Sequence, residues 1–135
     1  MFEVFDYSAR RGALVPLLAS IYKIICETKI KNPENFIFFK QRMSKLLIDI
    51  NYRWIIINEN KQLAGFLFYR YEGKNIYITD LHISKSVKTP VDAITMLIKK
   101  MEYDQGTKTA DFYENDFLLG DLKKTSDTLI LRYNK

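Results

Sequence analysis

Three runs of strand-forming residues follow one another with only short polar turns between them, and this pattern limits the fold more than any other feature. The runs span residues 54–57, 63–71 and 76–83, and residues 58–61 and 72–75 connect them. Connections this short join neighbouring antiparallel strands, because a parallel crossover needs a dozen residues or more. The centre of the chain is therefore predicted to be an antiparallel meander.

The third run contains a break in its alternation. The apolar residues at 76 and 78 alternate, and so do those at 81 and 83, but three positions separate Ile78 from Leu81. A β-bulge near residues 79–80 would keep both pairs on one face of the sheet. A strand that is covered on both faces, without a bulge, would explain the same residues.

Two helical segments precede the meander. Residues 13–28 carry apolar side chains at the spacing of one buried helix face. A second helix is predicted to begin at Asn32 and Pro33, with Asn32 as its N-cap, because proline suits the first helical position. Its buried face is predicted to run from Phe36 to Ile50.

A third helix follows the meander. Thr89 can cap it, Pro90 fits its first position, and Asp92 suits the positive end of the helix dipole. The helix is predicted to end near residues 105–106, where a glycine provides the stop.

The remaining segments complete a mixed α/β domain that spans residues 1–135. Residues 2–7 are a first strand, 107–113 a further strand, 116–124 a short helix and 128–133 a closing strand. The predicted order is β α α β β β α β α β, within the length of one ordinary domain.

The composition of the chain excludes some classes of function and disfavours others. The net charge of +5 favours acidic partners weakly, but the basic residues are dispersed, so binding to nucleic acid is disfavoured. A single Cys and a single His exclude a Cys/His zinc site, and we predict no metal. The sequence has neither a signal-peptide pattern nor a membrane-spanning apolar stretch, so we expect a cytoplasmic protein without a membrane partner.

Two local motifs resemble the GNAT superfamily of N-acetyltransferases. The segment GFLFYR at residues 65–70, followed after a turn by IYITDLHI at 76–83, is similar to the third and fourth strands of that family. The segment FYEN at residues 112–115 is similar to the end of its fifth strand. The element order matches the family over most of the chain, which implies a mostly antiparallel central sheet flanked by helices.

The resemblance implies a site for acetyl-CoA. In this family the fourth strand bulges and splays from the fifth, the acetyl group enters the gap, and the next loop binds the pyrophosphate at a helix N-terminus. The residues that this resemblance assigns to the cofactor are Leu81, His82, Ile83, Lys85, Ser86, Lys88, Thr89 and Asn115.

The loop after the fourth strand departs from the family pattern. Residues 84–91 contain no glycine, Pro90 lacks an N–H donor, and Asp92 adds negative charge in the first helical turn. Lys85 and Lys88 supply cations in return. Helix capping alone also explains the sequence of residues 89–92, without any ligand.

Three residues are candidates for the chemistry of acetyl transfer. Tyr113 resembles the tyrosine that often protonates the CoA sulfur in this family. Asp80 and His82 lie beside the predicted bulge, and either could act as the base for an amine, directly or through water. His82 alternates with Leu81 and Ile83, so it is expected to point away from them, toward solvent or the cleft.

Three functions fit these observations. The first is an N-acetyltransferase that moves an acetyl group from acetyl-CoA to an amine of a small molecule or a protein. The second is a catalytically inactive GNAT-like domain that serves binding or assembly, in which a homodimer would cover an exposed sheet edge. The third is a basic nucleic-acid-binding domain. Richness in Lys, Asn and Ile suits a bacterial or phage protein.

Overall fold

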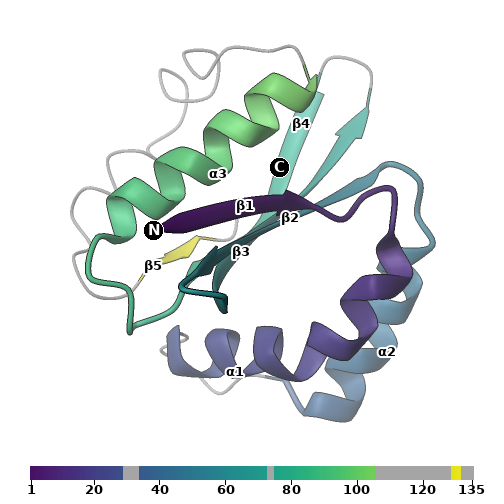
Figure 1. The fold of residues 1–135 in the computed structure, drawn as a ribbon. Helices are drawn as coiled ribbons and strands as arrows, with labels where there is room; N and C mark the ends of the chain where they lie inside the picture. Colours follow the sequence, from purple (N-terminus) through teal and green to yellow (C-terminus); the bar gives the residue numbers. More distant parts are fainter. Residues whose placement is uncertain (29–33, 73–74, 106–128, 132–135) are drawn as a thin grey trace.

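A five-stranded sheet with helices on both of its faces forms the structure (Figure 1). The computed structural model describes residues 1–28, 34–72, 75–105 and 129–131. The elements in chain order are β1 (Phe2–Asp6), the 3-10 helix η1 (Arg11–Leu17), α1 (Leu18–Thr28), α2 (Phe36–Leu47), β2 (Tyr52–Glu59), β3 (Gln62–Glu72), β4 (Asn75–Ile83), α3 (Pro90–Gln105) and β5 (Leu129–Leu131).

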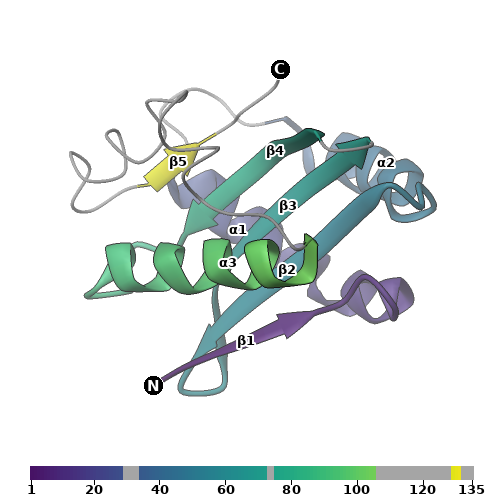
Figure 2. The same ribbon diagram turned by 90° about the horizontal axis from the view of Figure 1, so that it is seen from above.

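The sheet confirms the predicted meander. Its spatial order is β1-β2-β3-β4-β5, and every neighbouring pair is antiparallel (Figure 2). The turn between β2 and β3 consists of Asn60 and Lys61, whose φ angles of 52° and 67° lie in the left-handed region. Such angles are typical of the tight hairpin turn whose twist matches that of the strands.

The predicted bulge is present in β4. Phe68 of β3 pairs with Asp80 and the next residue, Tyr69, pairs with Ile78, so Thr79 is the extra residue. The Thr79 hydroxyl donates a hydrogen bond to the carbonyl of Phe68, 3.2 Å away. The bulge places Ile78 and Leu81 in the same core cluster, which is what the break in alternation required.

Each face of the sheet has its own apolar core. Helix α3 lies across one face, whereas α1 and α2 lie on the other (Figures 1 and 2). The buried cluster on the α3 face comprises Ile55, Ile57, Ala64, Leu67, Tyr69, Ile78, Leu81, Ile83, Val87, Ala93, Ile94, Leu97, Ile98 and Met101. The cluster on the other face comprises Leu14, Leu18, Ile21, Ile24, Ile25, Phe39, Met43, Trp54, Ile56, Phe66 and Phe68.

The predicted start of the second helix was wrong. Helix α2 begins at Phe36, and its N-cap is Asn35, whose side chain accepts a hydrogen bond of 2.7 Å from the N–H of Ile37. Residues 32–33, which we predicted to open the helix, lie outside the described residues. Ile50 was predicted to be buried, but it lies beyond the end of α2 and is 76% exposed.

The first predicted helix, over residues 13–28, consists of two pieces. Residues 11–17 form the 3-10 helix η1, which contains Pro16, and α1 begins at Leu18. A proline inside an α-helix removes a hydrogen bond and clashes with the preceding turn, so the regular helix starts only after it.

Arg11 fastens η1 to the segment between α2 and β2. Its guanidinium, a fork of five N–H donors, binds backbone carbonyls rather than a carboxylate. The acceptors are the carbonyls of Ser8, Leu47, Asp49, Ile50 and Tyr52. This single side chain thereby connects the start of η1 to the backbone between α2 and β2.

The closing strand β5 lies within the predicted range 128–133 and pairs with the C-terminal part of β4. The predicted strand at 107–113 and helix at 116–124 fall outside the described residues. Among the helices that are described, none has the length and apolar character needed to cross a membrane.

Candidate functional site

Asp80 and His82 lie side by side on the face of the sheet that α1 and α2 cover. The bulge turns them there, since they pair with Phe68 and Phe66 of β3, both members of that core. The ring of His82 lies 5.2 Å from that of Phe66, and its Nε2 is 3.6 Å from Oδ1 of Asp80. The two groups therefore form a carboxylate–imidazole pair next to the bulge.

The predicted exposure of His82 was wrong. The side chain does point away from Leu81 and Ile83, as the alternation indicated, but it is 0% exposed because α1 packs against β3 and β4 on this face. Asp80 is 5% exposed. Asp80 therefore keeps a small exposed surface, whereas His82 has none.

The loop that follows β4 leads directly into the N-terminus of α3. Ser84 keeps the register of the sheet, because its N–H donates to the carbonyl of Ala64 at 2.7 Å. A tight turn follows, in which the N–H of Val87 donates to the carbonyl of Ser84 at 3.1 Å. Val87 is buried, whereas the side chains of Lys85 and Lys88 are exposed. The loop is thus anchored by one apolar residue and presents two cations to solvent.

A carboxylate from α1 binds this loop. Oε1 of Glu27 accepts a hydrogen bond of 2.7 Å from the hydroxyl of Ser84 and one of 3.2 Å from the N–H of Lys85. The hydroxyls of Ser84 and Ser86 are also 3.0 Å apart. The start of the loop therefore already holds an anionic oxygen, supplied by the chain itself.

Further donors remain at the N-terminus of α3. The N–H groups of Asp92 and Ala93 donate to the carbonyl of Thr89, whereas those of Lys88, Thr89 and Val91 have no hydrogen-bond partner in the described part of the chain. Free N–H groups at a helix N-terminus, with a lysine beside them, suit a phosphate. The loop therefore fits the pyrophosphate of a nucleotide cofactor in donors and charge, although it lacks glycine.

Comparison with known proteins shows which fold carries this arrangement. No protein-family model and no curated protein sequence matches the chain. Solved structures do match. A ribosomal-protein-alanine N-acetyltransferase from Brucella melitensis biovar Abortus 2308 is 14% identical and has a TM-score of 0.50 over 80% of this chain and 76% of that one.

An aminoglycoside acetyltransferase from an uncultured soil metagenomic sample, solved in complex with sisomicin, is also 14% identical. It has a TM-score of 0.54 over 99% of this chain and 95% of that one. The chain has a GNAT-like fold. Likeness at this identity establishes the fold alone, so the reaction has to be argued from the site.

The resemblance predicted that the acetyl group enters a gap along the edge of β4 just past the bulge, where the fourth strand splays from the fifth. Here β5 pairs with that edge, opposite Leu81, His82 and Ile83. These three residues therefore lie between β3 and β5 rather than beside an open gap. Tyr113 and Asn115, the predicted acid and a predicted cofactor ligand, lie outside the described residues, and their roles stay predictions.

Sequence reasoning missed Glu27. Nothing marks this residue in α1, since its contact with Ser84 joins positions that are 57 apart in the sequence. Only the packing of α1 across β4 brings its carboxylate to the loop.

Proposed function

We propose that this protein is an N-acetyltransferase that uses acetyl-CoA and acts on an amine of a small molecule or a protein. One observation carries the proposal. In a GNAT-like fold, the bulged β4 presents Asp80 and then leads through residues 84–89 into the donor-rich N-terminus of α3. By their names, the two proteins compared above acetylate ribosomal-protein alanine and aminoglycosides. A screen of acceptors should therefore include a peptide that begins with alanine and the aminoglycoside sisomicin.

The residues of the loop would hold the cofactor by its pyrophosphate. The N–H groups of Lys88, Thr89 and Val91 are the donors, and the ammonium groups of Lys85 and Lys88 balance the phosphate charge. When bound, acetyl-CoA supplies an activated acetyl thioester.

Asp80 is the base in this proposal. A protonated amine has to lose a proton before it can act as a nucleophile, and a carboxylate within reach of it, directly or through one water, can take that proton. His82 serves as a positioning residue, because it is fully buried and its Nε2 lies 3.6 Å from Oδ1 of Asp80.

Replacing Lys88 by Ala is expected to weaken acetyl-CoA binding about tenfold, because one charge-assisted contact with phosphate is lost. Isothermal titration of the wild type and of K88A with acetyl-CoA and with CoA measures this. The matched control is K99A, which removes an exposed lysine of α3 outside the loop. Wild-type protein that binds neither ligand at concentrations of about 100 μM would exclude the enzyme.

The variant Glu27→Gln is expected to strengthen binding of the same ligands by about three- to tenfold. Its carboxylate competes with phosphate for the loop, and the amide keeps the size of the side chain but removes the charge. Glu3→Gln is the control, because Glu3 is an exposed residue of β1. Equal affinity of E27Q and the wild type would mean that Glu27 does not compete with the cofactor.

A second function is favoured by two observations of its own. Glu27 already binds the loop, and β5 already pairs with the edge of β4. Both suit a catalytically inactive GNAT-like domain that binds a partner. If the wild type binds neither acetyl-CoA nor CoA, this second function replaces the first.

A further inference from the structure

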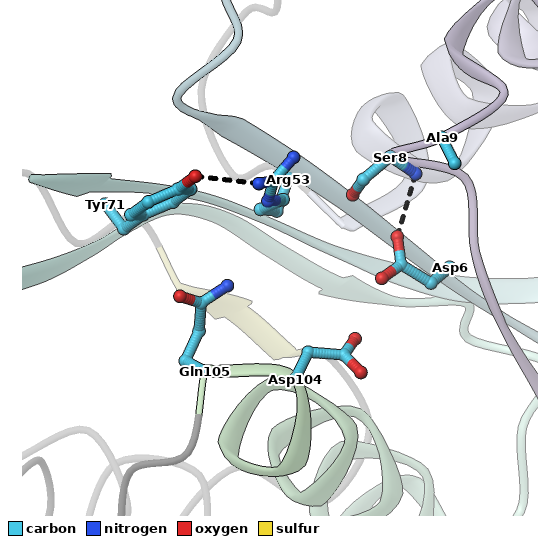
Figure 3. Close-up of a pocket in the computed structure, with 7 residues that line it drawn as sticks. All are labelled: Asp6, Ser8, Ala9, Arg53, Tyr71, Asp104 and Gln105. Carbon is cyan, nitrogen blue, oxygen red and sulfur yellow. Dashed lines mark hydrogen bonds between the residues drawn. The ribbon is translucent and has the colours of Figure 1, made fainter.

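A cavity of about 660 Å³ opens on the α3 face of the sheet, away from Asp80 and His82. It lies where the last turn of α3 passes the end of β1 and the adjoining parts of β2 and β3 (Figure 3). The volume falls in the range of pockets that hold small molecules. Its walls carry opposite charges.

Asp6 and Asp104 form the acidic wall. Asp6 Oδ1 accepts a hydrogen bond of 2.8 Å from the N–H of Ser8, and Asp104 Oδ1 accepts one of 2.9 Å from the ammonium of Lys100. Oδ2 of Asp104 is buried and has no hydrogen-bond partner among the residues that the structure describes. The acidic wall thus combines two neighbouring carboxyl groups, of which only Asp104 forms an ion pair with a lysine in the described part of the chain.

The two carboxyl groups differ in acidity. Burial raises the pKa of Asp104, and the adjacent Asp6 raises it further. Burial acts in the same direction on Asp6, but hydrogen bonds from Ser8 and from the Asp104 carboxyl group, together with the charge of Lys100, outweigh it and lower the pKa of Asp6. A cation bound beside Asp6 and Asp104 would reduce the electrostatic repulsion between their carboxyl groups.

Arg53 forms the basic wall together with Tyr71. Its Nη2 donates to the hydroxyl of Tyr71 at 2.7 Å, and the guanidinium lies 4.9 Å from the centre of that ring. No carboxylate of the described residues forms an ion pair with it. A guanidinium held in place by an aromatic ring, with donors to spare, is suited to bind a carboxylate.

We propose that this cavity binds a small zwitterion of the amino-acid or dipeptide class, with its carboxylate on Arg53 and its ammonium between Asp6 and Asp104. A ligand with only one of these charges would contact only one of the two walls. The side chain of Gln105 rises from the end of α3 beside Asp104 in Figure 3, and its amide nitrogen donates to the hydroxyl of Tyr69 at 2.8 Å. The proposal is independent of acetyl transfer, because the cavity and the β4 site lie on opposite faces.

Isothermal titration with glycylglycine, in the absence of acetyl-CoA, tests this inference. Glycylglycine is expected to bind, whereas N-acetylglycylglycine, which lacks the ammonium, and glycylglycinamide, which lacks the carboxylate, are each expected to bind at least about tenfold more weakly. The variants Arg53→Gln and Asp104→Asn are expected to lose a similar factor for glycylglycine. Arg42→Gln is the control, because Arg42 pairs with Glu34 outside the cavity.

Circular dichroism checks that each variant is folded. If R53Q does not fold, D104N and the two singly charged analogues still test the proposal. Absence of glycylglycine binding at about 10 mM, or equal binding of all three peptides, would overturn the proposal. Since no cofactor is present, neither result depends on whether the protein transfers acetyl groups.

Discussion

Replacing Asp80 by Asn is expected to lower the turnover of acetyl transfer about 100-fold and to leave the affinity for acetyl-CoA unchanged. The amide has the shape of the carboxylate but cannot take a proton from an ammonium. Steady-state kinetics that follow the released thiol, with whichever acceptor of the screen supports turnover, give kcat and KM separately. A loss confined to kcat is the signature of a missing base.

The geometry around Asp80 explains why the loss should be large. The side chain is nearly buried, and the register of the bulge fixes its position on β4. Asp49→Asn is the control, because Asp49 lies in the turn before β2. Turnover of D80N within about twofold of the wild type would remove Asp80 from the mechanism.

Local patterns predicted the sheet well because they depend on neighbouring residues. The spacing between Ile78 and Leu81 identified the bulge, since alternation in a strand fixes which face each side chain occupies. The predicted start of α2 was wrong, and the reason is also local. Asn32 and Asn35 are both good N-caps, and the proline after the first drew the prediction three residues too early.

Contacts between distant segments could not be read from the sequence. The alternation placed His82 on the correct face, but whether that face is open depends on α1, which packs on it from elsewhere in the chain. The same holds for Glu27 at the loop after β4 and for Asp6 beside Asp104. No periodicity relates such pairs, because each side chain is brought to its partner by the packing of whole elements.

Replacing Gly65 by Ala is expected to lower the free energy of unfolding by about 2–3 kcal/mol. A Cβ at this position of β3 would lie 2.6 Å from the backbone carbonyl oxygen of His82 and 2.6 Å from Cδ1 of Ile83. The side-chain atom could rotate away, but the carbonyl belongs to the β3–β4 ladder and cannot shift without disturbing the pairing of Gly65 with Ile83. Guanidinium denaturation followed by circular dichroism measures the loss.

Gly12→Ala is the matched control for this substitution. Nothing lies within 4 Å of a Cβ at Gly12, so its stability is expected to stay within about 0.5 kcal/mol of the wild type. Gly65 pairs with β4 just before the loop to which Glu27 of α1 binds. G65A is therefore also expected to displace this loop and weaken acetyl-CoA binding, whereas G12A is not. Equal stability of the two variants would mean that the β3–β4 ladder tolerates a shift there. The close approach of Gly65 to the backbone of His82 would then not be required to position β4 and the loop.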